Sequence, residues 1–262
     1  MTTEQGSPRK AEREDPRSIH QRMAADMRDD IFTGELPVGT KLSSTGQLIK
    51  RFNASNASVQ KAVGVLKAEE LVTARAGSGV TVTAKPRRTM TPAAYSTPVA
   101  PGETYRWISE AEQQGYRASS ELLTVGEVAA PKQVSAAFGL PDKALVGLRS
   151  QILFLDDKPA ELVHSYYPLS IATGTPLLER RKIRGGTPTL LAELGHPPAP
   201  GGTVDLVSAC IPTQEQFKLL QLPGELIPVL RTFRVVRSTK GEVIEVTIML
   251  KAGHLYELHY EF

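Results

Sequence analysis

The first 84 residues carry helix and turn signals in an order that few folds can accommodate. An apolar side chain recurs at every fourth position from Ile19 to Ile31, which predicts a helix with one buried face. Ser44 and Gln47 stand three residues apart as a capping box, so a second, short helix should begin there. An Asn-Ala-Ser turn interrupts that helix, and its Ser55 predicts the N-cap of a third helix.

A β-hairpin follows these helices, with strands at 71–74 and 80–83 and a glycine-rich turn between them. Helix, helix, three-residue turn, helix and hairpin is the order of a winged helix-turn-helix, whose third helix enters the major groove of DNA. Residues 36–90 hold nine basic and two acidic side chains, a net +7, whereas the whole chain carries +3. A basic segment of this size suits a polyanion, because each neutralised phosphate releases bound counterions.

Composition excludes several other classes of protein. No apolar run approaches the ~18 residues of a membrane span. The first residues lack the apolar stretch of a signal peptide, so we expect a cytoplasmic protein associated with the nucleoid. The single cysteine, Cys210, rules out disulfide frameworks and thiolate metal sites, and the five histidines show no metal-ligand spacing. We therefore expect neither a metal nor a cofactor.

The remainder of the chain divides into a linker and a second domain. Four prolines and little periodicity mark 85–104 as a linker, in which Arg87 and Arg88 either touch phosphate or, as is more common for basic linker residues, are merely solvated. We therefore expect a disordered tail at 1–15, a winged helix-turn-helix at 16–84 (the head), the linker, and a domain at 105–262 (the body). Short turns between successive strands demand an antiparallel sheet, so the body should be α+β. The expected elements of the body are strands at 122–128, 145–155, 160–167, 204–211, 228–237, 243–250 and 255–262, and helices at 105–114, at 132–138, from Pro188, and from Thr213 to Leu220.

The head resembles the GntR family of bacterial repressors, through IFTGELPVGTKLSSTGQLIKRFNASNASVQKAVGVLKAEELV and the wing RAGSGVTV. The body is similar to the UTRA ligand-sensing domain of the HutC-type subfamily, through LTVGEVAAPKQVSAAFGLP, LDDKPAELVHSYYP, TPTLLAELG, LQLPGELIPVLRT and GEVIEVTIMLKAGHLYELHYEF. The resemblance implies a winged helix-turn-helix followed by a chorismate-lyase-like antiparallel sheet with helices. It also implies a homodimer that represses from an inverted-repeat operator in double-stranded DNA and is released when a small metabolite occupies the UTRA pocket.

The resemblance places the DNA-contacting positions, and several depart from the family pattern. Gly46, Asn56 and Gln60 stand where the family usually carries arginine. Asparagine and glutamine suit adenine rather than guanine, so the operator should differ from the family's usual sequence. The alternative is that Asn56 and Gln60 are only exposed helix polarity, while the basic side chains nearby hold phosphates. The predicted DNA-binding residues are Lys41, Ser44, Lys50, Arg51, Asn56, Ser58, Gln60, Lys61, Arg75, Gly77, Ser78 and Gly79.

The predicted effector pocket departs from the family as well. Gln151 and Leu153 replace the Arg-x-Arg pair that binds phosphosugars in relatives, so the pocket should not favour a sugar phosphate. Arg149 shares their strand face by period two, and it is either an anion contact or part of a surface salt bridge. Trp107 could line the pocket, although a single tryptophan in a helix is more often part of the core, and His164 is interpreted as a packing residue. The other predicted effector contacts are Val163, Thr187, Thr189, Glu245 and Lys251, the last of which replaces a tyrosine.

Two other functions stay open at this point. One is an enzyme, because the chorismate-lyase-like fold is shared with a lyase, although no G-x-S-x-G, P-loop, H-E-x-x-H or G-x-G-x-x-G motif occurs. The other is a regulator that has lost sequence-specific DNA contacts and acts through protein partners. The missing arginines favour that second alternative, and the net +7 of residues 36–90 opposes it. The sequence favours a ligand-responsive, DNA-binding regulator without enzymatic activity.

Overall fold

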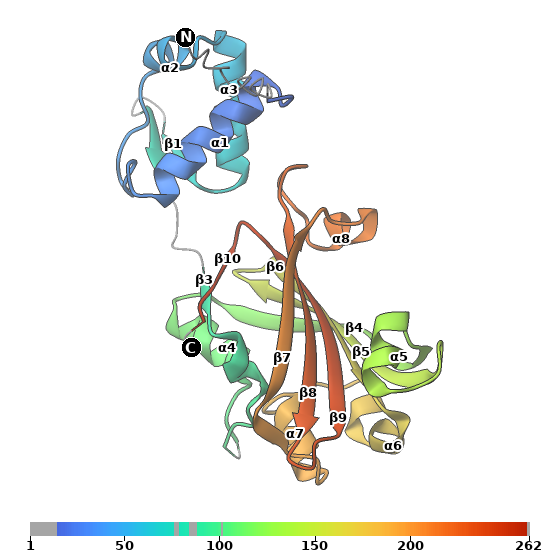
Figure 1. The fold of residues 1–262 in the computed structure, drawn as a ribbon. Coiled ribbons are helices and arrows are strands. Elements are labelled where there is room, and N and C mark those ends of the chain that lie inside the picture. Colours follow the sequence, from blue (N-terminus) through green and yellow to red (C-terminus); the bar gives the residue numbers. More distant parts are fainter. Residues whose placement is uncertain (1–14, 76–78, 84–87, 101, 261–262) are drawn as a thin grey trace, which may run out of the picture. The chain divides into compact units, whose positions relative to one another are not determined.

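The computed structural model describes residues 15–75, 79–83, 88–100 and 102–260 (Figure 1). These residues form two compact units, one on each side of residues 84–87. The N-terminal unit is the head and the C-terminal unit is the body. The tail predicted at 1–15 lies outside the described residues except for Asp15.

The head is the predicted winged helix-turn-helix. Its helices are α1 (Ile19–Phe32), α2 (Thr45–Phe52) and α3 (Asn56–Ala68), and its wing is the antiparallel pair β1 (Val72–Arg75) and β2 (Gly79–Val82). Both hydrogen bonds of the predicted capping box join Ser44 to Gln47 at the start of α2. Asn53 ends α2 in the left-handed conformation, at φ 47°, and Ser55 caps α3 two residues later. The helices share one apolar core, which includes Met23, Met27, Leu48, Val59, Val63 and Leu66.

The body is built on one antiparallel sheet of six strands, in the order β4-β5-β6-β9-β8-β7. The strands are β4 (Ala118–Ala129), β5 (Leu145–Leu155), β6 (Lys158–Tyr167), β7 (Pro198–Cys210), β8 (Val229–Ser238) and β9 (Val243–Ala252). The predicted α+β class is therefore confirmed. The two edge strands, β4 and β7, extend furthest beyond their predicted bounds, because solvated strand ends carry little hydrophobic alternation.

Short helices cover both faces of this sheet. They are α4 (Arg106–Gln113), α5 (Lys132–Phe138), α6 (Leu169–Ala172), α7 (Thr187–Glu193) and α8 (Gln214–Leu219), with 3-10 turns η1 (Pro92–Ser96) and η2 (Pro176–Leu178). One face packs on α5 through Val134. The opposite face, called the inner face below, packs on α4 and η1, where Trp107 and Tyr95 meet Met249. No helix in the described ranges is both long and apolar enough to cross a membrane.

Much of the segment predicted as a linker belongs to the body. Arg88–Met90 form strand β3, which pairs in parallel with β10 (Tyr256–Leu258) instead of joining the main sheet. η1 follows directly, and its Tyr95 is 5% exposed. A three-residue strand and a single 3-10 turn are too short to show a period, which is why the sequence indicated a linker. The last strand, predicted at 255–262, is shorter, because β10 ends at Leu258, and 261–262 lie outside the described residues.

Candidate DNA-binding face and effector cavity

The start of α3 presents the predicted base-reading side chains to solvent. Asn56 and Gln60 are both exposed, and they lie one helical turn apart on the same face. Ala57 and Gly64 are also exposed in α3 and carry little or no side chain. A helix with small residues near its amides can approach a groove closely and offer those amides to base edges.

Exposed basic residues flank this face, and one is already partly engaged. Lys41, Lys50 and Lys61 are exposed, as a phosphate contact requires. Arg51 is exposed too, but its Nη1 lies 2.8 Å from Asp30 Oδ2 and its guanidinium lies 4.7 Å from the centre of the Phe52 ring.

Of the other predicted DNA-binding residues, one is half-buried and several lie wholly or partly outside the described residues. Ser58 is half-buried. Its backbone N–H donates to the Ser55 hydroxyl at 3.2 Å and its own hydroxyl lies 3.0 Å from that hydroxyl, so Ser58 is tied to the residue that caps α3. Gly77, Ser78 and the side chain of Arg75 lie outside the described residues. Gly79 opens β2 with a φ of +84°, a conformation that glycine adopts without strain.

The inner face of the body's sheet is the floor of a cavity of about 360 Å³. Seven predicted effector contacts line it: Arg149, Gln151, Leu153, Val163, Thr187, Glu245 and Lys251. Thr189 is not among the lining residues. Its hydroxyl donates to the Gly185 carbonyl at 3.0 Å and accepts the Val99 N–H at 3.1 Å, so Thr189 supports the wall of the cavity.

Strand register arranges the floor in three rows. Read across β5, β6, β9 and β8, the rows are Leu153–Glu161–Lys251–Leu230, Gln151–Val163–Met249–Thr232, and Arg149–Ser165–Thr247–Arg234. Successive rows stand two residues apart on each strand, which is about 7 Å. The charged side chains therefore belong to the two outer rows, with Val163 and Met249 between them.

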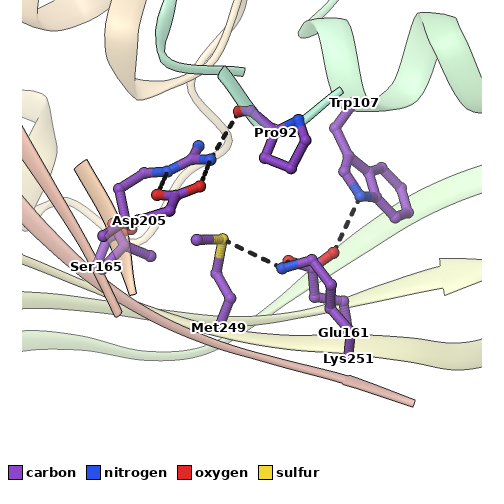
Figure 2. Close-up of polar contacts among 9 residues, drawn as sticks. Pro92, Trp107, Glu161, Ser165, Asp205, Met249 and Lys251 are labelled. Atoms are coloured by element: carbon purple, nitrogen blue, oxygen red, sulfur yellow. Dashed lines mark hydrogen bonds and ion pairs between the residues drawn. The ribbon is translucent and has the colours of Figure 1, made fainter. Parts of the chain in front are cut away.

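The first row holds a buried ion pair (Figure 2). Lys251 Nζ lies 3.1 Å from Glu161 Oε1, and neither side chain is more than 3% exposed. Trp107 Nε1 donates to Glu161 Oε2 at 3.2 Å, whereas the other contact of Lys251 Nζ is the Met249 sulfur at 3.6 Å. Burial lowers the pKa of Lys251, and the Glu161 carboxylate opposes that fall. Of the three N–H groups of the ammonium, one thus has an oxygen acceptor, one has the sulfur, and one has no acceptor among the described residues.

The third row ends in a second buried ion pair. Arg234 Nε and Nη2 donate to the two carboxylate oxygens of Asp205, each at 2.7 Å, and Nη2 also donates to the Pro92 carbonyl at 2.7 Å (Figure 2). Burial is the largest single influence and would lower the pKa of Arg234, but the hydrogen bonds to Asp205 and the charges of Asp205 and Glu245 together raise it. The guanidinium stays charged, and within the described chain its Nη1 has no partner.

Glu245 lies beside this row on β9. Its Oε1 accepts hydrogen bonds from the Tyr167 and Thr247 hydroxyls, each at 3.0 Å. Burial, with the neighbouring Glu245 carboxylate, raises the pKa of Tyr167, so that hydroxyl remains a donor. No cation of the described residues forms an ion pair with Glu245, and its Oε2 is left for a donor outside the chain.

Arg149 is not part of a surface salt bridge, so that one of its two predicted roles is wrong. It is 5% exposed and lines the cavity, and its guanidinium is bound by backbone carbonyls, while a contact with an anion stays a prediction. Nη1 donates to Pro176, Leu177 and Glu179 at 2.9–3.1 Å, and Nη2 donates to Arg181 at 2.7 Å. Burial lowers the pKa of Arg149. The side chain therefore fixes the 176–181 segment, which leads into the cavity wall at Lys182.

Arg88, predicted as a linker residue that touches phosphate or is solvated, is buried at 1% exposure, whereas Arg87 lies outside the described residues. The guanidinium carbon of Arg88 lies 4.2 Å from the centre of the Trp107 ring, and its Nη2 donates to the Trp107 carbonyl at 2.7 Å. Nε and Nη1 are buried without a hydrogen-bond partner in the described ranges. Arg88, Trp107, Glu161 and Lys251 thus form one connected series from β3 to the floor of the cavity.

Glu161 and Arg234 were not predicted as cavity residues, whereas for Trp107 the sequence left both a place in the pocket lining and a place in the core open. Trp107 is buried at 2% exposure and also lines the cavity. A signal for the other two was present, because each is a charged residue at an inward position of a largely apolar strand. Glu161 stands two residues from Val163, so period two assigns both to the same face.

Comparisons with known proteins follow the same two units. Residues 19–82 match the family described as bacterial regulatory proteins, gntR family, and residues 113–257 match the UTRA domain. An uncharacterized HTH-type transcriptional regulator of Streptomyces coelicolor is 28% identical over 242 residues, which is 89% of this chain and 88% of that protein. The crystal structure of a GntR-family transcriptional regulator matches with a TM-score of 0.59 at 20% identity, covering 94% of this chain and 97% of its own. PhnF from Mycobacterium smegmatis matches with a TM-score of 0.54 at 17% identity, covering 91% and 99%.

Proposed function

The chain belongs to the GntR family of bacterial regulators, in the HutC-type subfamily that carries a UTRA domain, and on this premise we propose that a small metabolite releases it from an inverted-repeat operator. The main support for this proposal is the cavity of about 360 Å³, whose buried charged side chains have hydrogen-bond donors without an acceptor among the described residues. A ligand that prefers one conformation of the body shifts its population, and release follows if that conformation disfavours DNA. The proposed site of action is the nucleoid in the cytoplasm.

A homodimer fits this proposal, because an inverted repeat presents two equivalent half-sites. β7 is an edge strand, and Val204, Leu206 and the following Ile211 are 54–78% exposed. Proteins normally cover an apolar sheet edge of this kind, since it invites further pairing. A second copy of the body is the proposed cover.

Promoter DNA should bind the purified protein more tightly than random DNA does, by at least about tenfold at physiological salt in a mobility-shift titration. Asn56→Ala and Gln60→Ala should each weaken promoter binding about 5- to 150-fold, which corresponds to the loss of one bidentate base contact. Neither should change binding to random DNA, because amides at base edges do not hold phosphates.

Lys61→Ala is the matched control on the same helix. It should weaken promoter and random DNA alike and lower the slope of affinity against salt by about one. If the wild-type protein shows no preference for its promoter, the operator-binding proposal is wrong. If Asn56→Ala and Gln60→Ala leave promoter binding unchanged, these residues are only exposed helix polarity.

The connected series from Lys251 to Arg88 offers a route by which a ligand in the cavity changes the contacts of Arg88 at the start of the body. Arg88 is the first described residue after 84–87, which separate the two units. A ligand that engages Lys251 changes the charge opposite Glu161, and Glu161 holds the Trp107 indole on which Arg88 is stacked. Coupling of this kind is reciprocal, so DNA binding should in turn perturb Trp107.

Titration with promoter DNA should therefore change the emission of Trp107, the only tryptophan of the chain. Arg88→Lys keeps the charge but loses the flat stack on the indole, so it should remove most of that change. Promoter affinity in this variant should stay within about twofold, because Arg88 touches no DNA in the proposal. Arg117→Lys, at an exposed site of the body, is the control that should respond as wild type. A wild-type emission that ignores promoter DNA would sink the proposed route.

The two rival functions find less support. No histidine or cysteine is among the described residues that line the cavity, so the lining lacks the commonest general base and a thiol nucleophile. We therefore propose that the protein is not an enzyme. The exposed amides and lysines of the head favour direct DNA contact over action through protein partners alone.

A further inference from the structure

Two buried cations face the cavity with hydrogen-bond donors that the described residues do not satisfy. Lys251 has one carboxylate oxygen and one sulfur as acceptors for three N–H groups. Arg234 uses Nε and Nη2 and keeps Nη1 unused, although its side chain is only 7% exposed. Leaving charged donors unmet in a buried site is costly, so the arrangement points to acceptors supplied by a ligand.

The register sets the separation of these donors. Lys251 pairs with Leu230 on β8, so Lys251 and Arg234 stand four residues apart along the strands, or about 13 Å between α-carbons. The Met249–Thr232 pair lies between them, with Val163 next to Met249. A ligand that satisfies both cations therefore needs two acceptor groups joined by an apolar segment that crosses Met249.

The charge of the lining favours acidic acceptors. Five basic and two acidic side chains line the cavity: Arg149, Lys182, Arg184, Arg234 and Lys251 against Glu161 and Glu245. A carboxylate forms charge-assisted hydrogen bonds with both ammonium and guanidinium groups, and these are about twice as strong as neutral ones. Glu245 has no ion pair within the described residues. It lies on β9 two residues beyond Thr247, the partner of Arg234, so a third acidic group at that end of the ligand should be repelled.

We propose that the cavity binds a small dicarboxylic acid, with one carboxylate on Lys251 Nζ, the other on Arg234 Nη1, and the chain between them over Met249. This inference rests on the proposed function of the body as a ligand sensor. The proposal places anion binding on β9 and β8. It does not place it on β5, because Gln151 and Leu153 are uncharged and Arg149 is bound to backbone carbonyls.

Isothermal titration calorimetry with matched probes tests the proposal. Glutarate and adipate should bind at least about tenfold more tightly than valerate and hexanoate, which have the same chain lengths and lack one carboxylate. Citrate and glucosamine 6-phosphate should bind more weakly than the better dicarboxylate. The same dicarboxylate should also change Trp107 emission, because the indole bonds to Glu161 beside Lys251.

Variants that remove each ion pair as a whole avoid leaving a buried charge unpaired. The double variants Lys251→Met/Glu161→Gln and Arg234→Gln/Asp205→Asn should each reduce dicarboxylate affinity to about that of the monocarboxylate. Arg237→Gln is the matched control, since Arg237 lies on β8 but is exposed and bonds to the Gly241 carbonyl. It should leave binding unchanged.

Several outcomes would overturn the proposal. They are no saturable binding of either dicarboxylate, equal binding of monocarboxylates and dicarboxylates, tighter binding of the sugar phosphate, or double variants that bind as wild type. Promoter binding is measured on the same preparation. If it persists while the dicarboxylates fail, only the ligand inference is wrong, and if it is lost, the proposed function itself fails.

Discussion

Replacing Arg149 with methionine should lower the free energy of unfolding of the body by about 2–4 kcal/mol. The four bonds from its guanidinium to backbone carbonyls contribute about 1.5–3 kcal/mol each, because the donor is charged. Against this gross gain stands a desolvation cost of several kcal/mol for burying a cation that has no carboxylate partner among these bonds. The carbonyls of the 176–181 segment lose their donor in the variant, so the net change remains destabilising.

Urea unfolding of the full chain measures this prediction. Arg180→Gln is the matched control, because Arg180 is exposed and also donates to two carbonyls, of Leu122 and Leu123, at 3.2 Å. An exposed site of this kind should change the free energy of unfolding by no more than about 0.5 kcal/mol. An Arg149→Met protein as stable as the Arg180→Gln protein would mean that Arg149 does not hold the segment.

Arg149 also illustrates what could and could not be predicted from the sequence. Period two correctly assigns it to the inner face with Gln151 and Leu153, since alternation depends only on strand geometry. Its partners are carbonyls 27–32 residues away, and a backbone carbonyl carries no sequence signal. The salt-bridge interpretation assumed a side-chain partner and the anion interpretation assumed a ligand, and neither considered backbone carbonyls.

The head was predicted more completely than the body because its signals are local. Ser44, Gln47 and Ser55 act on backbone groups within three residues, so the caps of α2 and α3 can be identified from the sequence. The ion pair of Glu161 and Lys251 instead depends on β6 lying beside β9, which are not consecutive in the chain. The resemblance supplied Lys251 as a site position, but only strand order supplies its partner.

Lys251→Met should lower the free energy of unfolding by about 3–5 kcal/mol, because it leaves Glu161 charged, buried and without a cation. Lys251→Met/Glu161→Gln should recover much of that loss, since the glutamine carbonyl still accepts the Trp107 N–H and no charge remains.

A double-mutant cycle tests this prediction. It compares the free energy of urea unfolding of the wild type, Lys251→Met, Glu161→Gln and the double variant. Residues in one ion pair are expected to show an interaction energy of about 0.5–3 kcal/mol, with the double variant less destabilised than the sum of the single variants. Purely additive effects would contradict a direct Glu161–Lys251 interaction. The recovered stability also has a functional consequence, because the double variant is then a folded protein without the Lys251 ammonium. Loss of dicarboxylate binding in it reports on recognition and not on unfolding.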